Sequence, residues 1–392
     1  MRTSICAFKE LSLVPHYSVS FLTPAEVEQS PSILAAWEDL LSHSTNLYRL
    51  YQSPEWWSHL GSVQGGPQRS LGVVRNSTDK VVGVVPVQIG QLSISFRLGS
   101  RKLWQMRFDT VFLLGSHPLL PDDESAYHQL FRSIWDSFSD CNSICMPSVF
   151  KESWCWRYSE PANSRSEKSW FLYSGENSRP FHIIRMPAAF EEYLKKFSSK
   201  RRYALRREMK LLQQRGGGNM QLERIENTEQ VDHFLDIAKP LFDRSWKGKR
   251  RLSSRLEGDK PHFEDLARRG ILRSYLLRCG DTYCAYAVGH QLRDVFHLIT
   301  IAHDPDFNEY SPGKVILLLI IEDLTNHIPP ETFSFGRDHL DYKAHFGTDR
   351  TEEATAILMR GTLANRFKCG CHHALRSSLR AIKRGLGRNT PT

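Results

Sequence analysis

The stretch IAHDPDFNEYSPGKVILLLIIEDL, residues 301–324, decides the fold class of this chain. An apolar strand-like run ends in it, a turn with Ser311, Pro312, Gly313 and Lys314 follows, and the turn opens a strongly apolar helix. No acidic residue occurs in the first two turns of that helix. Backbone N–H groups at such a helix start can hold phosphate oxygens. The stretch therefore predicts a site for a cofactor that carries a pyrophosphate.

The same residues also form an ordinary helix start, with Ser311 as the N-cap and Pro312 as the first helical residue. The surrounding order of elements favours the phosphate interpretation. Three strands are expected before the helix and one after it, at residues 273–277, 283–291, 295–301 and 332–335. The sequence contains neither GxGxxG nor GxxxxGK[ST], so it predicts neither a dinucleotide fingerprint nor a P-loop.

The same order of elements is predicted earlier in the chain, which indicates a duplicated α/β unit. Its strands and helix are expected at residues 70–75, 81–89, 108–114, 124–138 and 143–147. The two copies differ at the helix start, where the first has Asp122, Asp123 and Glu124. Carboxylates there suit the helix dipole but would repel a pyrophosphate. Only the second copy is therefore expected to bind an anionic cofactor.

The composition is that of a globular protein with more than one domain. The chain has 392 residues, of which 40% are hydrophobic and 24% charged, and this length favours two domains. The longest apolar run, residues 315–321, is too short to span a membrane. The first residues show no apolar signal segment, so a cytoplasmic location is expected. The eight cysteines form no CxxC pair; CGCHH at 369–373 is a conceivable metal site, but no metal is expected.

Four stretches, in order, resemble a known family. They are FSSKRRYALRREMKLL, LFDRSWKG, HDPDFNEYSPGKVILLLIIEDL and FSFGRDHLDYKAHFG, at residues 197–212, 241–248, 303–324 and 333–347. Together they resemble the CelD-like acetyltransferases associated with bacterial polysaccharide biosynthesis, GNAT-superfamily proteins with a two-unit arrangement similar to the Fem-type peptidoglycan aminoacyl transferases. The resemblance covers residues 181–360 well and the N-terminal half loosely.

The resemblance implies an α/β (α+β) protein with the GNAT acyl-CoA N-acyltransferase fold, in two tandem GNAT-like units of which the N-terminal one is degenerate. It also implies acetyl-CoA or another acyl-CoA as co-substrate. The predicted organisation is an N-terminal unit, a linker, a catalytic unit and a basic tail, at residues 1–165, 166–180, 181–362 and 363–392.

Direct acyl transfer requires a base, donors for the developing oxyanion and an acid for the leaving thiolate. The family pattern of an acidic residue, a spacer, Tyr-Lys and an aromatic matches Asp338, Tyr342, Lys343 and Phe346. The spacer departs from the pattern, and Asp341 competes with Asp338 for the acidic role. Tyr342 would protonate the thiolate, and Lys343 would steady the oxyanion or a substrate carboxylate. In the simpler alternative Asp338 caps a short helix and Lys343 is a solvated surface charge.

Backbone N–H groups at 299–302 are the expected oxyanion donors, and His303 and Glu309 are alternative bases. His303 precedes Asp304 and Pro305, however, which favours a turn. The cofactor contacts are expected from Ser311, Pro312, Gly313 and Lys314.

A basic helix at residues 200–215 supplies the acceptor-side candidates. Arg202 and Arg206 lie one turn apart and could clamp a carboxylate or phosphate, although most of this basic face is expected to be solvated. Trp246 is either core or a wall over the acceptor.

The C-terminal tail is a basic amphipathic helix. Residues 354–392 contain eight Lys or Arg and no acid. Such a helix can pack on the protein body, lie on anionic lipid or bind nucleic acid nonspecifically.

The sequence thus predicts a cytoplasmic acyl-CoA-dependent N- or O-acyltransferase with a small-molecule or glycan-precursor acceptor, possible peripheral contact with the inner membrane face through the basic tail, and no specific nucleic acid. The alternatives are a Fem-like aminoacyl-tRNA-dependent transferase and a non-catalytic GNAT-fold scaffold.

Overall fold

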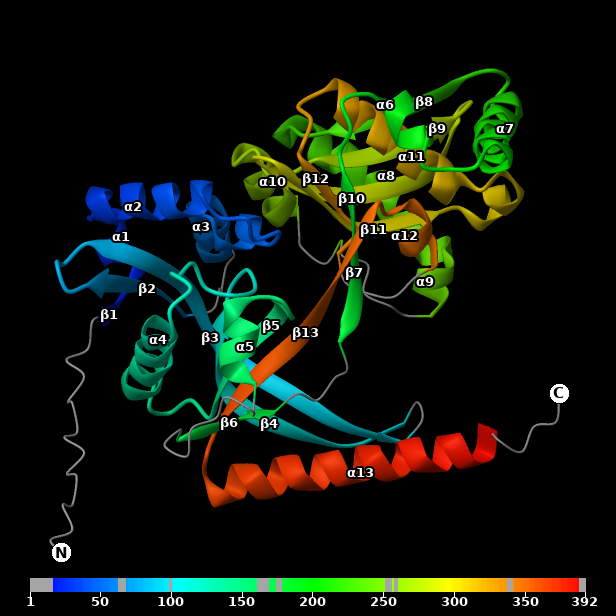
Figure 1. Cartoon of the computed structure of the whole chain (residues 1–392). Coiled ribbons are helices and arrows are strands. Elements are labelled where there is room, and N and C mark those ends of the chain that lie inside the picture. Colours follow the sequence, from blue (N-terminus) through cyan, green and yellow to red (C-terminus); the bar gives the residue numbers. More distant parts are fainter. Residues whose placement is uncertain are drawn as a thin grey trace, which may run out of the picture. The chain divides into compact units, whose positions relative to one another are not determined.

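The computed structural model describes residues 17–62, 68–98, 101–160, 169–173, 178–250, 256, 260–336 and 341–387. The chain divides into two compact units (Figure 1), each built from separate stretches of sequence. Unit 1 comprises Met1–Asn46, Pro67–Asn177 and Ala354–Thr392, and unit 2 comprises Leu47–Gly66 and Ser178–Glu353.

Unit 1 is a sheet with helices. Its described elements are β1 (Tyr17–Leu22), α1 (Pro24–Glu28), α2 (Pro31–Ser42), β2 (Arg69–Asn76), β3 (Val81–Leu98), β4 (Arg101–Leu113), α4 (Glu124–Ser137), β5 (Ser143–Phe150), α5 (Trp154–Ser159), β6 (Trp170–Tyr173), the end of β13 (Asp349–Arg360) and α13 (Leu363–Gly387). The strand order is β1-β2-β3-β4-β5-β13, and β6 pairs with β13. Strand β6 lies within the stretch predicted as a linker.

Unit 2 is a sheet covered on both faces. Its described elements are η1 (Arg49–Gln52), α3 (Pro54–Ser62), β7 (Arg179–Arg185), α6 (Phe190–Leu194), α7 (Ser199–Arg215), β8 (Met220–Ile225), η3 (Thr228–Gln230), α8 (Val231–Arg244), α9 (Trp246–Lys249), α10 (Lys260–Arg268), β9 (Ser274–Cys279), β10 (Thr282–Leu292), β11 (Val295–His303), η4 (Pro305–Tyr310), α11 (Pro312–Asn326), β12 (Thr332–Ser334) and α12 (Asp341–Phe346). The order is β7-β12-β11-β10-β9-β8, and the first residues of β13 pair with β7.

The two cores of unit 2 follow from strand alternation, because successive side chains of a strand point to opposite faces. Tyr275 and Leu277 pack with α6, α7 and α11, whereas Leu276 packs with α8 and α10. Helix α11 is apolar over most of its surface because it is buried between the sheet and the α6–α7 pair.

The predicted repeat is confirmed. In unit 1, β2, β3 and β4 pair antiparallel and β5 then pairs parallel with β4. In unit 2, β9, β10 and β11 pair antiparallel and β12 then pairs parallel with β11. A helix, α4 or α11, makes the crossover in each case. The strands and helices predicted for both copies are present, with ends that differ by a few residues; β3 and β4 are the longest extensions.

Candidate functional site

A β-bulge on β11 alters the strand pairing at one end of the sheet in unit 2. Val288 of β10 lies opposite Thr300, and Gly289 lies opposite Leu298, so Ile299 is an extra residue with no partner on β10. A bulge reverses the alternation of side chains beyond it. Ile301 therefore contacts the same core as Leu298, on the face covered by α11.

The two parallel strands beside this bulge separate. β12 pairs with β11 only from Val295 to His297, whereas β11 continues to His303. Within the described residues, β11 thus has no β12 partner beyond His297. Its remaining backbone groups, which include the predicted oxyanion donors at 299–302, border the turn that leads into α11.

That turn brings the α11 N-terminus against the end of β11. Ser311 has left-handed backbone angles, φ 53° and ψ 47°, and its side chain makes no capping hydrogen bond. A non-glycine residue with left-handed backbone angles is strained, and such residues cluster at ligand sites. A Cβ added to Gly313 would lie 3.1 Å from Nδ1 of His303, so the helix start and this imidazole are in close contact. The other ring nitrogen, Nε2, is 2.9 Å from Oδ1 of Asn308.

A pocket of about 330 Å³ opens at this point of unit 2. It is formed by the end of β11, the η4–α11 turn, α9 and α12. Its lining residues are Trp246, Lys247, Ile301, His303, Asn308, Ser311, Gly313, Lys314, Leu317, Tyr342 and Phe346.

Three of the four predicted cofactor residues line the pocket: Ser311, Gly313 and Lys314. Pro312 is the first residue of α11 and is buried. The ammonium of Lys314 lies 2.9 Å from Oε1 of Glu208 on α7. The cation at the helix start is therefore partly neutralised, a feature that the sequence did not indicate.

Of the predicted catalytic residues, the structure places one in the pocket and one outside it. Tyr342 on α12 lines the pocket and its ring makes an edge contact with Phe335, with centroids 6.1 Å apart. Lys343 is buried, is not among the lining residues, and has its ammonium 3.5 Å from the carbonyl oxygen of Gly336. It is thus not a solvated surface charge. Asp338 lies outside the described residues.

Of the predicted acceptor-side residues, only one lines the pocket. Trp246 is 43% exposed and forms one wall of the pocket. Arg202 donates to the carbonyl oxygen of Phe197 at 2.6 Å, and Arg206 forms an ion pair with Glu191 at 2.9 Å. The two arginines do not line the pocket; they tie α7 to the α6 segment.

Lys247 is a pocket residue that sequence reasoning missed. It follows Trp246 on α9, and its ammonium donates to Oγ1 of Thr300 at 3.0 Å, next to the bulge. Ser245 caps this short helix by accepting from the backbone of Gly248. The adjacent Trp246 drew attention to the segment, but nothing in the sequence shows that Lys247 turns toward β11.

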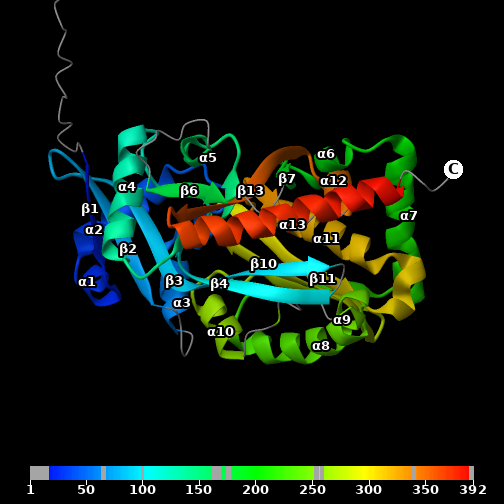
Figure 2. The ribbon, with the colours of Figure 1, turned by 90° about the horizontal axis from the view of Figure 1, so that it is seen from below.

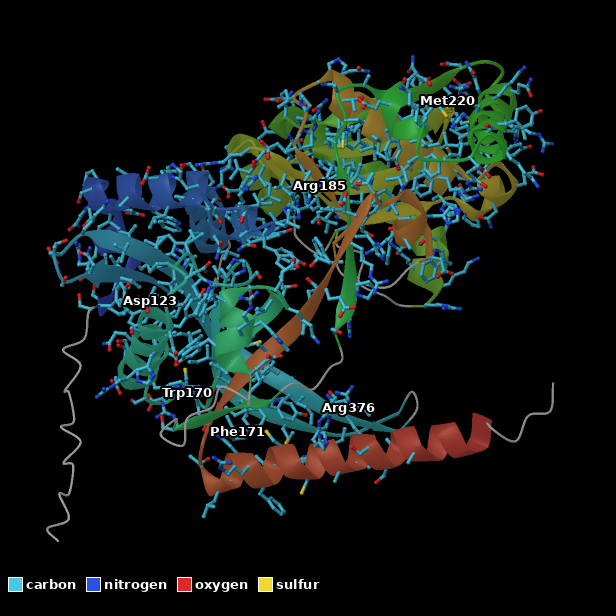
Figure 3. The ribbon with its side chains drawn as sticks, in the orientation of Figure 1. Asp123, Trp170, Phe171, Arg185, Met220 and Arg376 are labelled. Carbon is cyan, nitrogen blue, oxygen red and sulfur yellow. The ribbon has the colours of Figure 1, made fainter. Side chains whose placement is uncertain are left out.

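The corresponding helix start of unit 1 differs chemically. Asp123 is the N-cap of α4 and accepts from the backbone N–H of Ser125 at 2.7 Å (Figure 3). A 2.7 Å hydrogen bond from the hydroxyl of Tyr17 lowers the pKa of Asp123 from its ordinary value. A carboxylate thus occupies the position that an anionic ligand would take.

Comparisons with known proteins agree with this architecture. Residues 199–344 match the family model described as an acetyltransferase (GNAT) domain. No curated protein matches the sequence. The crystal structure of FemX superposes with a TM-score of 0.56 at 10% identity, over 84% of this chain and 96% of that chain. This similarity shows a shared fold.

Two further solved structures are similar at lower scores. One is the C-terminal domain (DUF2156) of a putative lysylphosphatidylglycerol synthetase from Agrobacterium fabrum, with 11% identity, a TM-score of 0.49, and coverage of 88% of this chain and 97% of that chain. The other is a tandem GNAT protein from the clavulanic acid biosynthesis pathway, with 12% identity, a TM-score of 0.46, and coverage of 88% and 99%.

The fold and the domain match together define the class of the protein: it is an acyltransferase with a GNAT domain in unit 2. Within the described part of the chain, no group of three or more His, Cys, Asp or Glu side chains could hold a metal ion. No helix among those residues is both long and apolar enough to cross a membrane.

Proposed function

We propose that the chain transfers an acyl group from an acyl-CoA directly to an amino or hydroxyl group of a sugar or envelope-polysaccharide precursor, as its resemblance to the CelD-like acetyltransferases implies. The observation that carries the proposal is the pocket in which the bulged end of β11 meets the start of α11. A helix start with a glycine and a lysine attracts phosphate. Where β11 and β12 separate, the backbone groups of β11 that have no β12 partner among the described residues lie beside this helix start.

The residues present fit a pyrophosphate. Gly313 leaves no side chain between the helix start and a ligand, and Lys314 adds a positive charge. No acid occurs in the first turn of α11. Gly313 and Lys314 would hold the phosphate groups, and the bound acyl-CoA would supply the activated thioester.

The groups for the transfer step come from the same pocket. The acceptor amine or hydroxyl attacks the thioester carbonyl, the carbon–sulfur bond breaks, and a proton must reach the thiolate. Tyr342 would deliver that proton. Lys247 and backbone N–H groups near Ile299 would stabilise the developing oxyanion. His303, Asp338 and Asp341 are the candidates for the base.

The proposed location is the cytoplasm, at the inner face of the membrane, without a specific nucleic acid partner. The basic tail supports this part of the proposal, because residues 354–392 carry eight Lys or Arg and no acid.

Calorimetric titration with acetyl-CoA tests the donor. The wild type should bind at micromolar concentration, and Gly313→Glu, which places bulk and negative charge at the helix start, should abolish binding. Ser137→Glu is the control, since it adds the same charge at an exposed position of α4 in unit 1. A folded wild type that binds neither acetyl-CoA nor longer acyl-CoAs would contradict the proposal and favour an aminoacyl-tRNA donor or a non-catalytic scaffold.

A further inference from the structure

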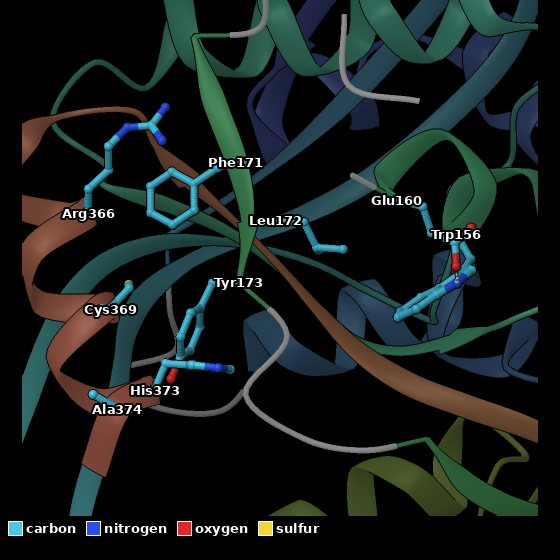
Figure 4. Close-up of a pocket in the computed structure, with 10 residues that line it drawn as sticks. Trp156, Glu160, Phe171, Leu172, Tyr173, Arg366, Cys369, His373 and Ala374 are labelled. Atoms are coloured by element: carbon cyan, nitrogen blue, oxygen red, sulfur yellow. Dashed lines mark hydrogen bonds between the residues drawn. The ribbon is translucent and has the colours of Figure 1, made fainter. Parts of the chain in front are cut away.

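A second pocket, of about 620 Å³, lies in unit 1 along β6 (Figure 4). It is bounded by α5, β6 and α13, and its size falls within the range of small-molecule sites, about 300–1,000 Å³. None of its residues takes part in the site of unit 2. It is also separate from the start of α4, where Asp123 caps the helix.

The walls of this pocket are apolar. Phe171 and Tyr173 face the core that includes α13, whereas Leu172 packs with the core of α4 and α5. All three consecutive side chains border the pocket, together with Trp156. In the described residues β6 pairs only with β13. The pocket therefore runs along the other edge of β6 and is contacted from both faces of the strand.

The wall formed by α13 is fixed in place. The hydroxyl of Tyr173 is hydrogen-bonded to Nδ1 of His372, and Nε2 of the same ring contacts the carbonyl oxygen of Ser95 on β3. Lys368 lies over the ring of Phe108 on β4. Helix α13 accordingly runs beside the β3–β4 hairpin in both views (Figure 1, Figure 2). The pocket is thus preformed and not created by a mobile helix.

Charge distinguishes the two sides of the pocket. The guanidinium of Arg366 lies 5.0 Å from the centroid of the Phe171 ring. Among the described residues it has no carboxylate partner, and the segment from 354 onward contains no acid. On the other side of β6 in Figure 4, Glu160 accepts a hydrogen bond from Nε1 of Trp156 at 2.7 Å. Glu160 disfavours an anionic group on the Trp156 side, and Arg366 favours one on the other side.

We propose that this pocket binds an anionic amphiphile, with an alkyl chain along the aromatic wall of β6 and a phosphate or carboxylate on Arg366. A ligand with only an uncharged alkyl chain would leave Arg366 without an anionic partner. A small anion alone would leave the apolar wall exposed to water. The neighbouring surface agrees with an amphiphilic ligand, because Leu363 and Phe367 of α13 are 87% and 74% exposed. The inference is independent of the acyl transfer proposed for unit 2.

Binding of three probes tests the proposal on the full chain. Decyl phosphate carries both the alkyl chain and the charge, decyl maltoside only the chain, and inorganic phosphate only the charge; calorimetry below the micellar concentration compares them. Decyl phosphate should bind at least tenfold more tightly than either of the others. Equal binding of decyl maltoside, or no binding of decyl phosphate, would overturn the proposal.

Two variants locate the binding. A Cβ at Gly370 meets nothing within 4 Å, so Gly370→Leu can extend a side chain into the pocket, and it should abolish decyl phosphate binding. Arg366→Gln should weaken binding roughly tenfold, whereas Lys368→Gln, an equal loss of charge outside the pocket, should not. Unchanged binding in Gly370→Leu, or equal weakening in both charge variants, would refute the site. Thermal unfolding checks that each variant is folded.

A vesicle experiment identifies the source of the amphiphile. Co-sedimentation of the wild type, but not of Gly370→Leu, with phosphatidylcholine vesicles containing 30% phosphatidylglycerol would identify a bilayer lipid. Decyl phosphate binding without co-sedimentation would identify a soluble amphiphile. Either result upholds the pocket.

Discussion

At the scale of single residues, Lys247 is a side chain that the structure adds to the candidate site. Its ammonium contacts Thr300 beside the bulge, whereas Lys249 on the same helix is exposed. If Lys247 stabilises the oxyanion, Lys247→Met should lower kcat by about 100-fold and leave acetyl-CoA affinity nearly unchanged. Release of CoA thiol, with glucosamine as the test acceptor, measures this. Lys249→Met is the matched control, and equal rates in the two variants would remove Lys247 from the mechanism.

A substitution of Glu208 is expected to strengthen acetyl-CoA binding. Its carboxylate pairs with Lys314, and the second oxygen of that carboxylate is buried and has no hydrogen-bond partner among the described residues. Glu208→Gln removes a negative charge from beside the helix start, so acetyl-CoA should bind several-fold more tightly. Lys314→Met should weaken binding, and the difference between the variants should shrink in high salt. Weaker binding in Glu208→Gln, measured by calorimetry, would show that the ion pair serves to orient Lys314.

At the scale of elements, the bulge on β11 depends on Gly289. A Cβ at this position would lie 2.4 Å from the carbonyl oxygen of Arg273 and 2.4 Å from Cζ of Phe296. Gly289→Ala should therefore lower the free energy of unfolding by more than ~2 kcal/mol and also weaken acetyl-CoA binding. Gly270→Ala is the control, since it meets no atom within 4 Å but has φ +67°; it should cost about 1 kcal/mol. Urea unfolding compares them, and similar losses would show that the bulge tolerates a side chain.

The sequence predicted the repeated elements because apolar periodicity and turn residues are local signals. Ser198, which caps α7, and the glycines from Gly216, which end it, are local signals of this kind. Strand β13 was not predicted, and neither was the pairing of β6 with it, because strand partners distant in sequence leave no local pattern. The same limit applies to the site. The turn at Ser311 and Gly313 was visible in the sequence, but the contact of Lys247 with β11 and the ion pairs of α7 depend on tertiary packing.

At the scale of the whole molecule, unit 2 contains buried histidines that bear on its stability. Burial lowers the pKa of His290 and His297 to about 3, and that of His262 to about 4. His59 is also lowered, mainly by burial, although Nδ1 is 2.7 Å from the carboxylate of Asp265. Burial disfavours ionisation of Asp265, but hydrogen bonds from Arg269, His59 and Ser62 together lower its pKa. These contacts join α3 to α10.

The sign of the pH effect follows from these shifts. An unfolded histidine takes up a proton below about pH 6.5, whereas the buried rings do so only near pH 3–4. The unfolded state therefore binds more protons in that window, and stability falls with acidification by about 1.4 kcal/mol per pH unit for each such ring. Above pH 6.5 the histidines contribute no pH dependence. Asp265 adds a further loss as the pH falls below its unfolded pKa of about 3.9.

The contribution of one buried histidine to this pH dependence can be measured with a single variant. His297 stacks on Tyr48 with centroids 6.1 Å apart, and its buried Nε2 has no hydrogen-bond partner in the part of the chain that the structure describes. His297→Phe keeps the stack and removes the titrating group, so the slope of unfolding free energy between pH 4 and 5.5 should fall by about 1.4 kcal/mol per pH unit. Urea unfolding at several pH values measures the slope, and the exposed His345→Phe is the control. An unchanged slope in His297→Phe would mean that this ring is already protonated in the folded protein, so that neither its burial nor the nearby charge of Arg49 keeps it neutral.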